Sequence, residues 1–252
     1  MKRHFKKSPS LFLSAFLTAL ALSNLQNIEA HNEETFPSKE TDVCRRYSVK
    51  IEDLLFHHQD QQALVLAGQA IQQDKNCAKA YMRKGFILAN LDKPEEAINF
   101  LRSGFKLCPN FPEHWAWCAL AQALFEVHQE KQAFEVLDKG LIHASGKHFI
   151  YDVRARMHAE MNNFDLSIKD FTTAIDTCPD KSKGDYRSRG LTYMRMHQYQ
   201  KAISDFDQAI KYDSKNAYFY TSRSKAYEAL GKTQRAKIDA AEAKRLSTVD
   251  EF

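Results

Sequence analysis

The 252-residue chain lacks the short motifs that usually accompany catalysis or metal binding. It has no Cys-x-x-Cys pair, no His-Glu-x-x-His segment, no glycine-rich phosphate loop and no Gly-x-Ser-x-Gly elbow. Its ten histidines show no metal-ligand spacing, because His57 and His58 are consecutive and point in different directions on a helix. We therefore expect no enzyme activity, no metal site and no cofactor.

A hydrophobic run long enough to cross a membrane is also missing from the N-terminal region. The apolar run Leu11–Leu22 covers twelve residues, whereas a membrane-spanning helix needs about 20. The run is preceded by four basic residues and followed by a polar stretch that ends at Ala30, an order typical of a secretory signal peptide. We predict a signal peptide over residues 1–30 and a flexible lead-in over residues 31–43. The alternatives are an uncleaved membrane anchor and an N-terminal helix packed on the rest of the chain.

Excess charge of one sign is missing once the leader is set aside. The chain carries 36 basic and 32 acidic side chains, and residues 1–30 hold four of the basic groups and one of the acids. The remainder has 32 basic against 31 acidic groups and no concentrated basic face, which does not favour nucleic acid as a partner. Asn-x-Ser/Thr sequons are also absent, which favours a bacterial protein exported to the periplasm or outside the cell.

Aromatic residues recur at intervals of 34 to 36 residues, which indicates a repeat array. They are Tyr47, Tyr81, Trp117, Tyr151, Tyr186 and Tyr220. If each stands at position four of a unit, the units are residues 44–77, 78–111, 114–147, 148–181, 183–216 and 217–250. Positions eight, twenty and twenty-seven are then almost always small, as in Gly85, Ala97 and Gly104, at helical spacing. Small columns of this kind predict helices whose backbones approach closely.

A column of turn-forming residues at position fifteen predicts where each unit bends into two helices. It reads His58, Asp92, His128, Asn162, His197 and Gly231. Glycine adopts positive φ freely, and asparagine, aspartate and histidine do so more readily than other side chains. The three histidines in this column are thus expected to be turn residues and not metal ligands.

The complete pattern resembles the tetratricopeptide repeat, most clearly in Tyr186, Gly190, Tyr193, Ala202 and Phe206. The resemblance covers residues 44–250 and implies an all-α, right-handed solenoid of about six helical hairpins. It also implies that the first helix of each unit lines a concave groove, through positions two, five, nine, twelve and thirteen. The predicted peptide-binding residues are Met82, Phe86, Trp115, Gln122, Phe149, Arg156, Arg187, Arg195, Tyr218 and Lys225. The alternative is that several of these side chains pack on neighbouring repeats instead.

The five cysteines raise the question of a disulfide. Cys44 starts the first helix of its unit and Cys77 follows the second, so antiparallel helices bring both to one end of the hairpin. Cys77 and Cys108 bracket the next unit in the same way. We predict that Cys77 bonds either Cys44 or Cys108, and the alternative, that all five are reduced, stays open.

Together these features predict an exported, monomeric scaffold or adaptor that binds a protein or peptide in its groove. We expect no stable membrane insertion after the signal peptide is removed. The Lys-then-Asn arrangement that some tetratricopeptide proteins use to bind chaperone tails never appears at positions five and nine. The alternative function is a secreted effector that engages a host protein through its convex face or loops. The alternative location is a membrane to which an uncleaved N-terminal segment anchors the protein.

Overall fold

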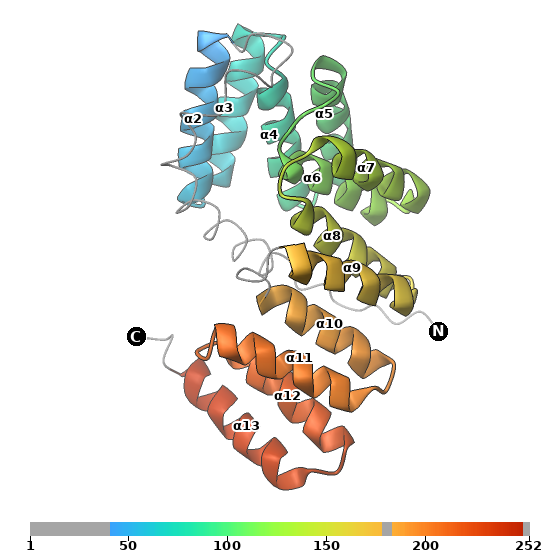
Figure 1. Ribbon diagram of the computed structural model, residues 1–252. Helices are drawn as coiled ribbons and strands as arrows, with labels where there is room; N and C mark the ends of the chain where they lie inside the picture. The colour runs from blue at the N-terminus through green and yellow to red at the C-terminus, as the bar shows by residue number, and fades with distance from the viewer. Residues whose placement is uncertain (1–40, 178–182, 249–252) are drawn as a thin grey trace, which may run out of the picture. The chain divides into compact units, whose positions relative to one another are not determined.

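The computed structural model describes residues 41–177 and 183–248, which form twelve helices (Figure 1). Those in the first half are α2 (Asp42–Phe56), α3 (Asp60–Gln73), α4 (Ala78–Asn90), α5 (Pro94–Leu107), α6 (His114–Glu126) and α7 (Glu130–His143). Those in the second half are α8 (Lys147–Glu160), α9 (Phe164–Thr177), α10 (Lys183–Arg195), α11 (Tyr199–Tyr212), α12 (Ala217–Ala229) and α13 (Thr233–Ser247). The predicted signal peptide and the lead-in up to residue 40 lie outside the described residues.

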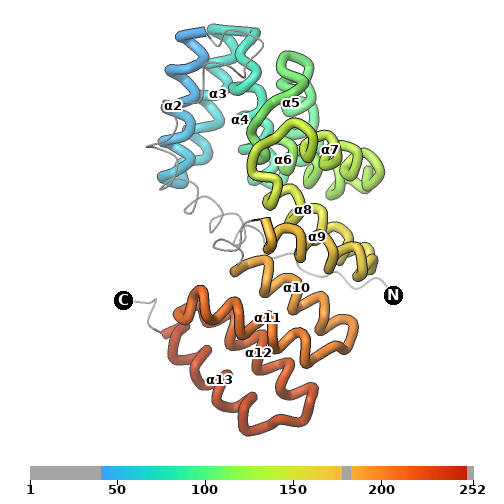
Figure 2. Tube along the Cα trace, viewed as in Figure 1, coloured from blue at the N-terminus to red at the C-terminus, as the bar shows by residue number. Residues whose placement is uncertain are grey.

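Consecutive helices pair as antiparallel hairpins, and the chain divides into two compact units of three hairpins each (Figure 2). The N-terminal unit contains α2–α7 and ends at Ser145, and the C-terminal unit contains α8–α13 and begins at Gly146. Within each unit, the second helix of one hairpin packs on the first helix of the next, as α3 does on α4 and α11 on α12. The expected all-α fold of repeated helical hairpins is confirmed.

Every hairpin turns at the predicted position-fifteen residue. All six residues of that column have φ between 55° and 69°, whether glycine or not. In the third hairpin the His128 N–H donates to the Phe125 carbonyl at 3.1 Å and the Gln129 N–H donates to the Leu124 carbonyl at 2.8 Å. The other five hairpins repeat these two bonds, which satisfy the last carbonyls of the first helix in a Schellman arrangement. The predicted turn column is confirmed: its histidines adopt the positive φ of the turn, and their backbone N–H groups donate to carbonyls of the first helix.

The small columns lie where the helices of a hairpin meet. Position twenty is at most 2% exposed in all six hairpins, from Ala63 to Ala236. A Cβ on Gly85 would lie 2.6 Å from the Leu101 side chain, and one on Gly190 would lie 2.6 Å from the Phe206 ring. Since non-bonded carbon atoms do not approach this closely, glycine at these positions is what lets a large side chain of the second helix reach the first helix.

None of the helices in the described ranges combines the length and the apolar character that crossing a membrane requires.

Candidate interaction surfaces on the first helices

The first helices of neighbouring hairpins contact one another within each unit, and their outward positions form one surface in each unit. In the N-terminal unit α4 touches α2 and α6, and in the C-terminal unit α10 touches α8 and α12. We call these two faces the N-terminal surface and the C-terminal surface. The ten predicted groove residues all lie on these first helices, four in the N-terminal unit and six in the C-terminal unit.

The N-terminal surface offers less accessible apolar area than its composition implies. Met82 is fully buried, where it fills the space left by Gly104, and therefore has no surface for a partner. Trp115 is 7% exposed and packs edge-on against Phe86, with ring centroids 5.7 Å apart. Phe86 and Gln122 are half-buried and remain accessible.

A mixed-charge network that the sequence did not single out occupies the rest of the N-terminal surface. Arg83 donates to the Glu52 carboxylate at 2.8 Å, and Lys79 bridges Glu52 and Glu113 at 3.2 and 3.3 Å. Arg83 also lies over the Trp115 ring at 3.9 Å, while the Trp115 indole N–H donates to Glu113. Two acids and two bases therefore compensate each other across α2, α4 and the start of α6.

Burial and neighbouring charges have opposite effects on the pKa values of the groups in this network. Burial alone would raise the pKa of Glu113, but the Lys79 and Arg83 charges outweigh it and hold that pKa below its ordinary value. Burial alone would lower the pKa of Lys79, but Glu113 and Glu52 outweigh it and raise that pKa. Both groups are thus charged at neutral pH, and the network stabilises the unit without leaving a net charge.

Two of the predicted groove arginines on the C-terminal surface have partners within the chain. Arg156 forks onto the Asp152 carboxylate one turn earlier on α8, with one contact at 3.0 Å. Arg195 donates to the Ala159 carbonyl at 2.6 Å and to the Asn162 side chain at 2.7 Å, and so ties α10 to the turn of the preceding hairpin. Both side chains therefore have a structural role.

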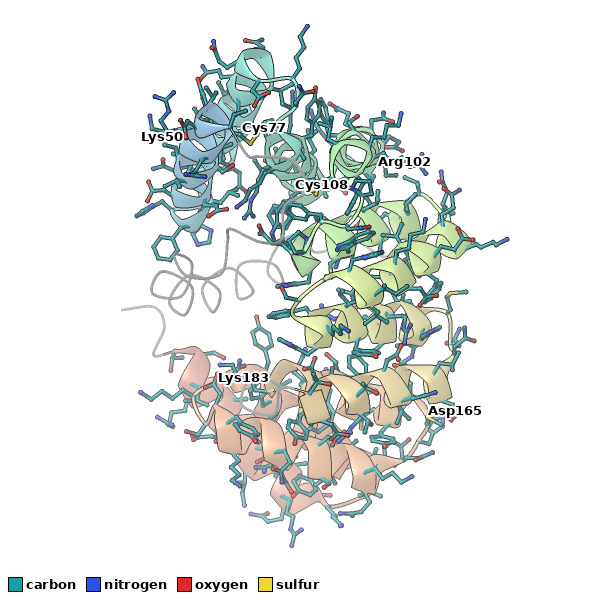
Figure 3. The ribbon with its side chains drawn as sticks, turned by 45° about the horizontal axis from the view of Figure 1, so that its top comes forward. Lys50, Cys77, Arg102, Cys108, Asp165 and Lys183 are labelled. Carbon is teal, nitrogen blue, oxygen red and sulfur yellow. A yellow bond between two sulfur atoms is a disulfide. The ribbon has the colours of Figure 1, made fainter. Side chains whose placement is uncertain are left out.

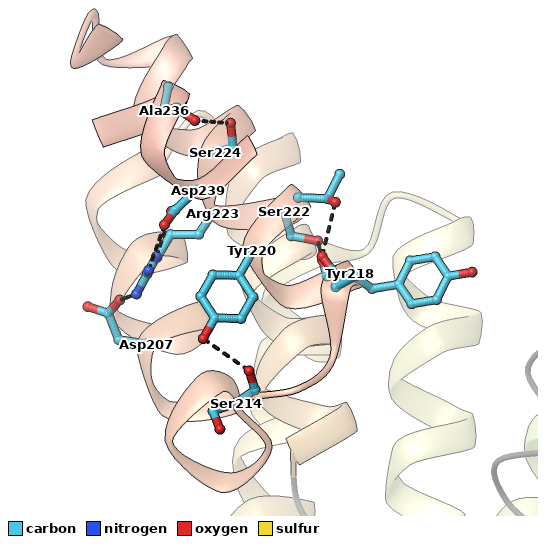
Figure 4. Close-up of polar contacts among 11 residues, drawn as sticks. Asp207, Ser214, Tyr218, Tyr220, Ser222, Arg223, Ser224, Ala236 and Asp239 are labelled. Atoms are coloured by element: carbon cyan, nitrogen blue, oxygen red, sulfur yellow. Dashed lines mark hydrogen bonds and ion pairs between the residues drawn. The ribbon is translucent and has the colours of Figure 1, made fainter. Parts of the chain in front are cut away.

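The remaining predicted residues of this surface are more open. Tyr218 is 62% exposed, and Figure 4 shows its ring directed away from α12. The Arg187 guanidinium lies over this ring, 5.8 Å from its centroid, and Arg187 forms no ion pair with any described carboxylate. Lys225 is exposed on the same face of α12, and Phe149 is half-buried at the start of α8 beside the His148 ring.

A second set of arginines in the C-terminal unit is used to hold the hairpins together. Arginine at position seven binds aspartate at position twenty-three through two nitrogens, at 2.7 to 2.9 Å, in all three hairpins of this unit. The pairs are Arg154–Asp170, Arg189–Asp205 and Arg223–Asp239. We call this set the Arg–Asp ladder.

The Arg–Asp ladder also links consecutive hairpins. Arg189 donates to Thr172 of the preceding hairpin at 2.9 Å, and Arg223 binds Asp207 of the preceding hairpin at 2.6 Å (Figure 4). The ladder aspartates are 4 to 5% exposed, so the three Arg–Asp pairs are internal and not available to a partner. The signal in the sequence was the regular sixteen-residue separation of arginine and aspartate in the last three units.

The structure joins Cys44 to Cys77, one of the two pairings that the sequence left open. Their Cα atoms are 5.4 Å apart, and the bond ties the start of α2 to the residue before α4. Cys108 is a buried thiol outside this bond, and burial raises its pKa, so it is unreactive at neutral pH (Figure 3). The pairing of Cys77 with Cys108 is therefore excluded in this structure, while Cys178 lies outside the described residues.

Over residues 41–177 and 183–248, no group of three or more histidine, cysteine, aspartate or glutamate residues is arranged to hold a metal ion. The hairpins, their outward first-helix surfaces and their internal ladder define a helical-repeat protein. This architecture provides surfaces for other macromolecules.

Comparison with known proteins identifies the kind of repeat. Family models described as tetratricopeptide repeat match residues 78–111 and 185–216. The crystal structure of PilW, described as a widely conserved type IV pilus biogenesis factor, superposes with a TM-score of 0.74 at 16% identity, covering 83% of this chain and 99% of PilW. Pseudomonas aeruginosa PilF gives a TM-score of 0.68 at 13% identity, covering 81% of this chain and 91% of PilF.

The sequence relatives are longer proteins. Human DnaJ homolog subfamily C member 7 is 24% identical over 225 residues, 78% of this chain and 45% of that protein. Human tetratricopeptide repeat protein 16 is 24% identical over 261 residues, 94% of this chain and 28% of that protein. The chain thus spans less than half of the length of these relatives. It contains tetratricopeptide repeats and has their fold, which implies protein partners.

Proposed function

We propose that the protein is a non-enzymatic scaffold or adaptor that binds a protein or peptide along the first-helix surfaces of its repeats. The observation that carries this proposal is the pair formed by Tyr218 and Arg187. A tyrosine that is 62% exposed and an arginine without a carboxylate partner among the described residues stand together on the C-terminal surface. Tyrosine and arginine are enriched at the energetic centres of protein interfaces, since each combines a large contact area with a polar group.

The ten predicted groove residues contribute to this function in different ways. Arg187, Tyr218 and Lys225 are proposed to contact the partner directly, together with Phe86, Gln122 and Phe149. Arg156 and Arg195 are proposed to shape the surface, because each already binds a group of the chain. Met82 and Trp115 support the N-terminal surface from below.

We further propose that the protein is exported, to a periplasm or outside the cell, after removal of residues 1–30. The order of basic, apolar and polar residues in the leader supports cleavage after Ala30. The Cys44–Cys77 disulfide supports an oxidising compartment, since such bonds are rare where thiols are kept reduced. The protein is proposed to act as a monomer.

The intact mass of the protein from fractionated host cells, prepared without reductant, tests the location. A chain that starts at His31 and lacks two protons relative to the reduced form is expected, from an exported fraction. A mass that retains the leader would refute cleavage and leave the scaffold proposal standing. Native mass spectrometry of the same sample should give one chain per particle.

Partner capture tests the binding surface. Arg187→Glu and Lys225→Glu should each reduce recovery of the native partner from exported host proteins. Lys169→Glu is the matched control, because Lys169 is exposed on the second helix α9 and its change alters the net charge equally. Capture that survives both surface variants would refute the first-helix surface. Its loss with Lys169→Glu would in addition favour the convex face used by the alternative effector.

A further inference from the structure

Arg187 is a cation whose charge is not balanced within the described chain. Its Nε atom is shielded from solvent and has no hydrogen-bond partner, and burial lowers the pKa of the guanidinium, an effect that Tyr218 offsets only in part. The neighbouring arginines differ, since Arg189 is held by Asp205 and Arg195 by the Asn162 side chain. A partly dehydrated, uncompensated cation attracts an anion more strongly than a fully hydrated one.

Tyr218 places an accessible aromatic ring beside this cation. Its backbone N–H is already used by the Asn216 side chain, which caps α12, while the ring extends outward. A depression of about 550 Å³ adjoins the ring and is lined in part by Thr221, Lys215 and Ser247. The acidic group in its lining, Asp213, is paired with Lys183 at 2.9 Å.

Lys225 adds a second cation on the same face of α12. It lies seven residues after Tyr218, which corresponds to two helical turns and about 10 Å along the axis. Thr221 lies between them on α12, and Leu191, which is 36% exposed, lies one turn after Arg187 on α10. Glu228 is exposed one turn beyond Lys225, and no ion pair joins the two in the C-terminal unit as described.

We propose that the C-terminal surface binds an extended acidic segment of a partner protein, in which two acidic side chains about three residues apart flank an apolar one. Arg187 lies over the Tyr218 ring, and Lys225 is about 10 Å further along α12 than Tyr218, which three residues of an extended chain match because each advances about 3.3 Å. One carboxylate would bind Arg187 and the other Lys225, while the apolar side chain would lie against Tyr218 and Leu191. This inference names the partner class for the surface of the proposed function and rests on it.

An acidic peptide fits these groups better than a nucleic acid does. Few uncompensated cations of the described residues face this surface, Arg187 and Lys225 are separated by an aromatic and an aliphatic side chain, and the chain without its leader is nearly neutral. Phosphate-backbone binding depends on many closely spaced basic groups. A peptide with two carboxylates and an apolar residue needs only two cations and an apolar contact, and this surface provides both.

A random twelve-residue peptide library, displayed with its C-terminus fused and therefore not free, tests the inference against the full-length mature protein. Enriched peptides should carry two aspartates or glutamates separated by two or three positions, with an apolar residue between them. An enriched peptide, synthesised with blocked ends, should bind in fluorescence anisotropy. Replacing either acid by its amide should weaken binding about tenfold or more, the size of a lost charge-assisted hydrogen bond.

Protein variants complete the test. Arg187→Gln and Lys225→Gln should each lower the affinity for the acidic peptide by about tenfold, whereas Lys169→Gln on α9 should leave that affinity unchanged. Because Arg187 is half-buried, circular dichroism melting must show that its variant is folded, and the exposed Lys225 provides the independent case.

The outcomes separate this inference from the proposed function. Enriched peptides without acidic residues would overturn the acidic segment and leave peptide binding intact. An empty selection, or an acid preference that survives both variants, would also overturn it. Native-partner capture that ignores the first-helix surface would instead refute the proposed function.

Discussion

In the C-terminal unit every hairpin joins an arginine at position seven to an aspartate at position twenty-three, whereas the N-terminal unit has neither residue type at those positions. There position seven is lysine, lysine and leucine, and position twenty-three is leucine, phenylalanine and valine. In the second hairpin Lys84 lies over the Phe100 ring at 4.3 Å instead of forming an ion pair. One backbone geometry thus accepts a buried ion pair, a cation on a ring or an apolar pair at the same two places.

The N-terminal unit has other constraints in place of the Arg–Asp ladder. The Cys44–Cys77 bond fixes its first hairpin to the start of the second. Trp117 donates to the Phe111 carbonyl at 2.8 Å and packs on Phe105, with ring centroids 4.2 Å apart. The comparison shows that the repeat fixes the helices and their turns, while each unit is held by its own set of side-chain contacts.

The largest expected difference between the units concerns the disulfide. Cys77→Ser should destabilise the first hairpin by about 3–4 kcal/mol, because the bond closes a loop over a 33-residue separation and restricts the unfolded chain. Hydrogen exchange measured by mass spectrometry should show faster exchange in α2 and α3 and unchanged exchange in α12 and α13. Cys108→Ser is the control that removes a thiol outside the bond, and equal loosening of both units by Cys77→Ser would contradict this view.

The Arg–Asp ladder should be the corresponding weak point of the C-terminal unit. Asp205→Asn should cost about 2–4 kcal/mol, because it leaves Arg189 buried without its carboxylate. The double change Arg189→Leu with Asp205→Val copies the leucine and valine that the third hairpin has at these positions, and it should cost less than the single change. Urea denaturation of the three proteins measures both effects, and a double variant less stable than Asp205→Asn would contradict the idea that the two solutions are interchangeable.

The mixed-charge network should give the N-terminal unit its own dependence on pH. The folded pKa of Glu113 lies below its ordinary value of 4.5, so its stabilising contribution is present above pH 4.5 and is lost as pH falls through the folded value. The pKa of Lys79 is raised above 10.5, so its contribution is present below pH 10.5 and is lost as pH rises through the folded value.

Glu113→Gln should therefore reduce stability at pH 7 and flatten the decline of stability as pH falls below 4.5. The loss should be smaller than that of Asp205→Asn, because the Glu113 side chain is 31% exposed and water screens its charge. Hydrogen exchange in α4 and α6 at several pH values measures this effect. An acid decline that stays equally steep in the variant would assign it to other carboxylates.

The smallest expected effects concern the turns, which both units share. Gly231→Ala should cost about 1 kcal/mol, because φ is 69° there and a Cβ disfavours that region. His128→Gly should stabilise its hairpin by up to about 1 kcal/mol, since φ is 60° at this position. Thermal unfolding followed by circular dichroism checks both, and opposite signs would show that the His128 side chain makes a compensating contact.

Most of the fold could be predicted from the sequence because the same pattern of aromatic, small and turn residues recurs in six units. The small residues Gly190 and Ala202 and the turn residue His197 act within one hairpin, and the spacing of Tyr186 and Tyr220 marks the repeat from one hairpin to the next. Local geometry decides such positions, so a column of aligned residues reveals them. The same reasoning did not reveal the mixed-charge network, because Glu52 and Lys79 belong to different hairpins, Glu113 precedes the third, and the three residues share no column.

The candidate surface was accessible only in part, because helical periodicity says which face a residue occupies and not what binds it there. Arg156, Arg187 and Arg195 looked equivalent in sequence, yet Asp152 binds the first and the turn at Asn162 binds the third. Met82 has the spacing of a groove residue but fills the space above a glycine.

The sequence by itself determined the hairpins, their turns and the close approach of their helices, since these depend on backbone conformation and side-chain size at fixed intervals. Only the tertiary structure decided that Cys77 bonds Cys44, which arginines are paired internally, and that Arg187, beside Tyr218, has no carboxylate partner among the described residues. Bond pairing and charge balance depend on distances between side chains from different helices, and a one-dimensional spacing does not contain those distances.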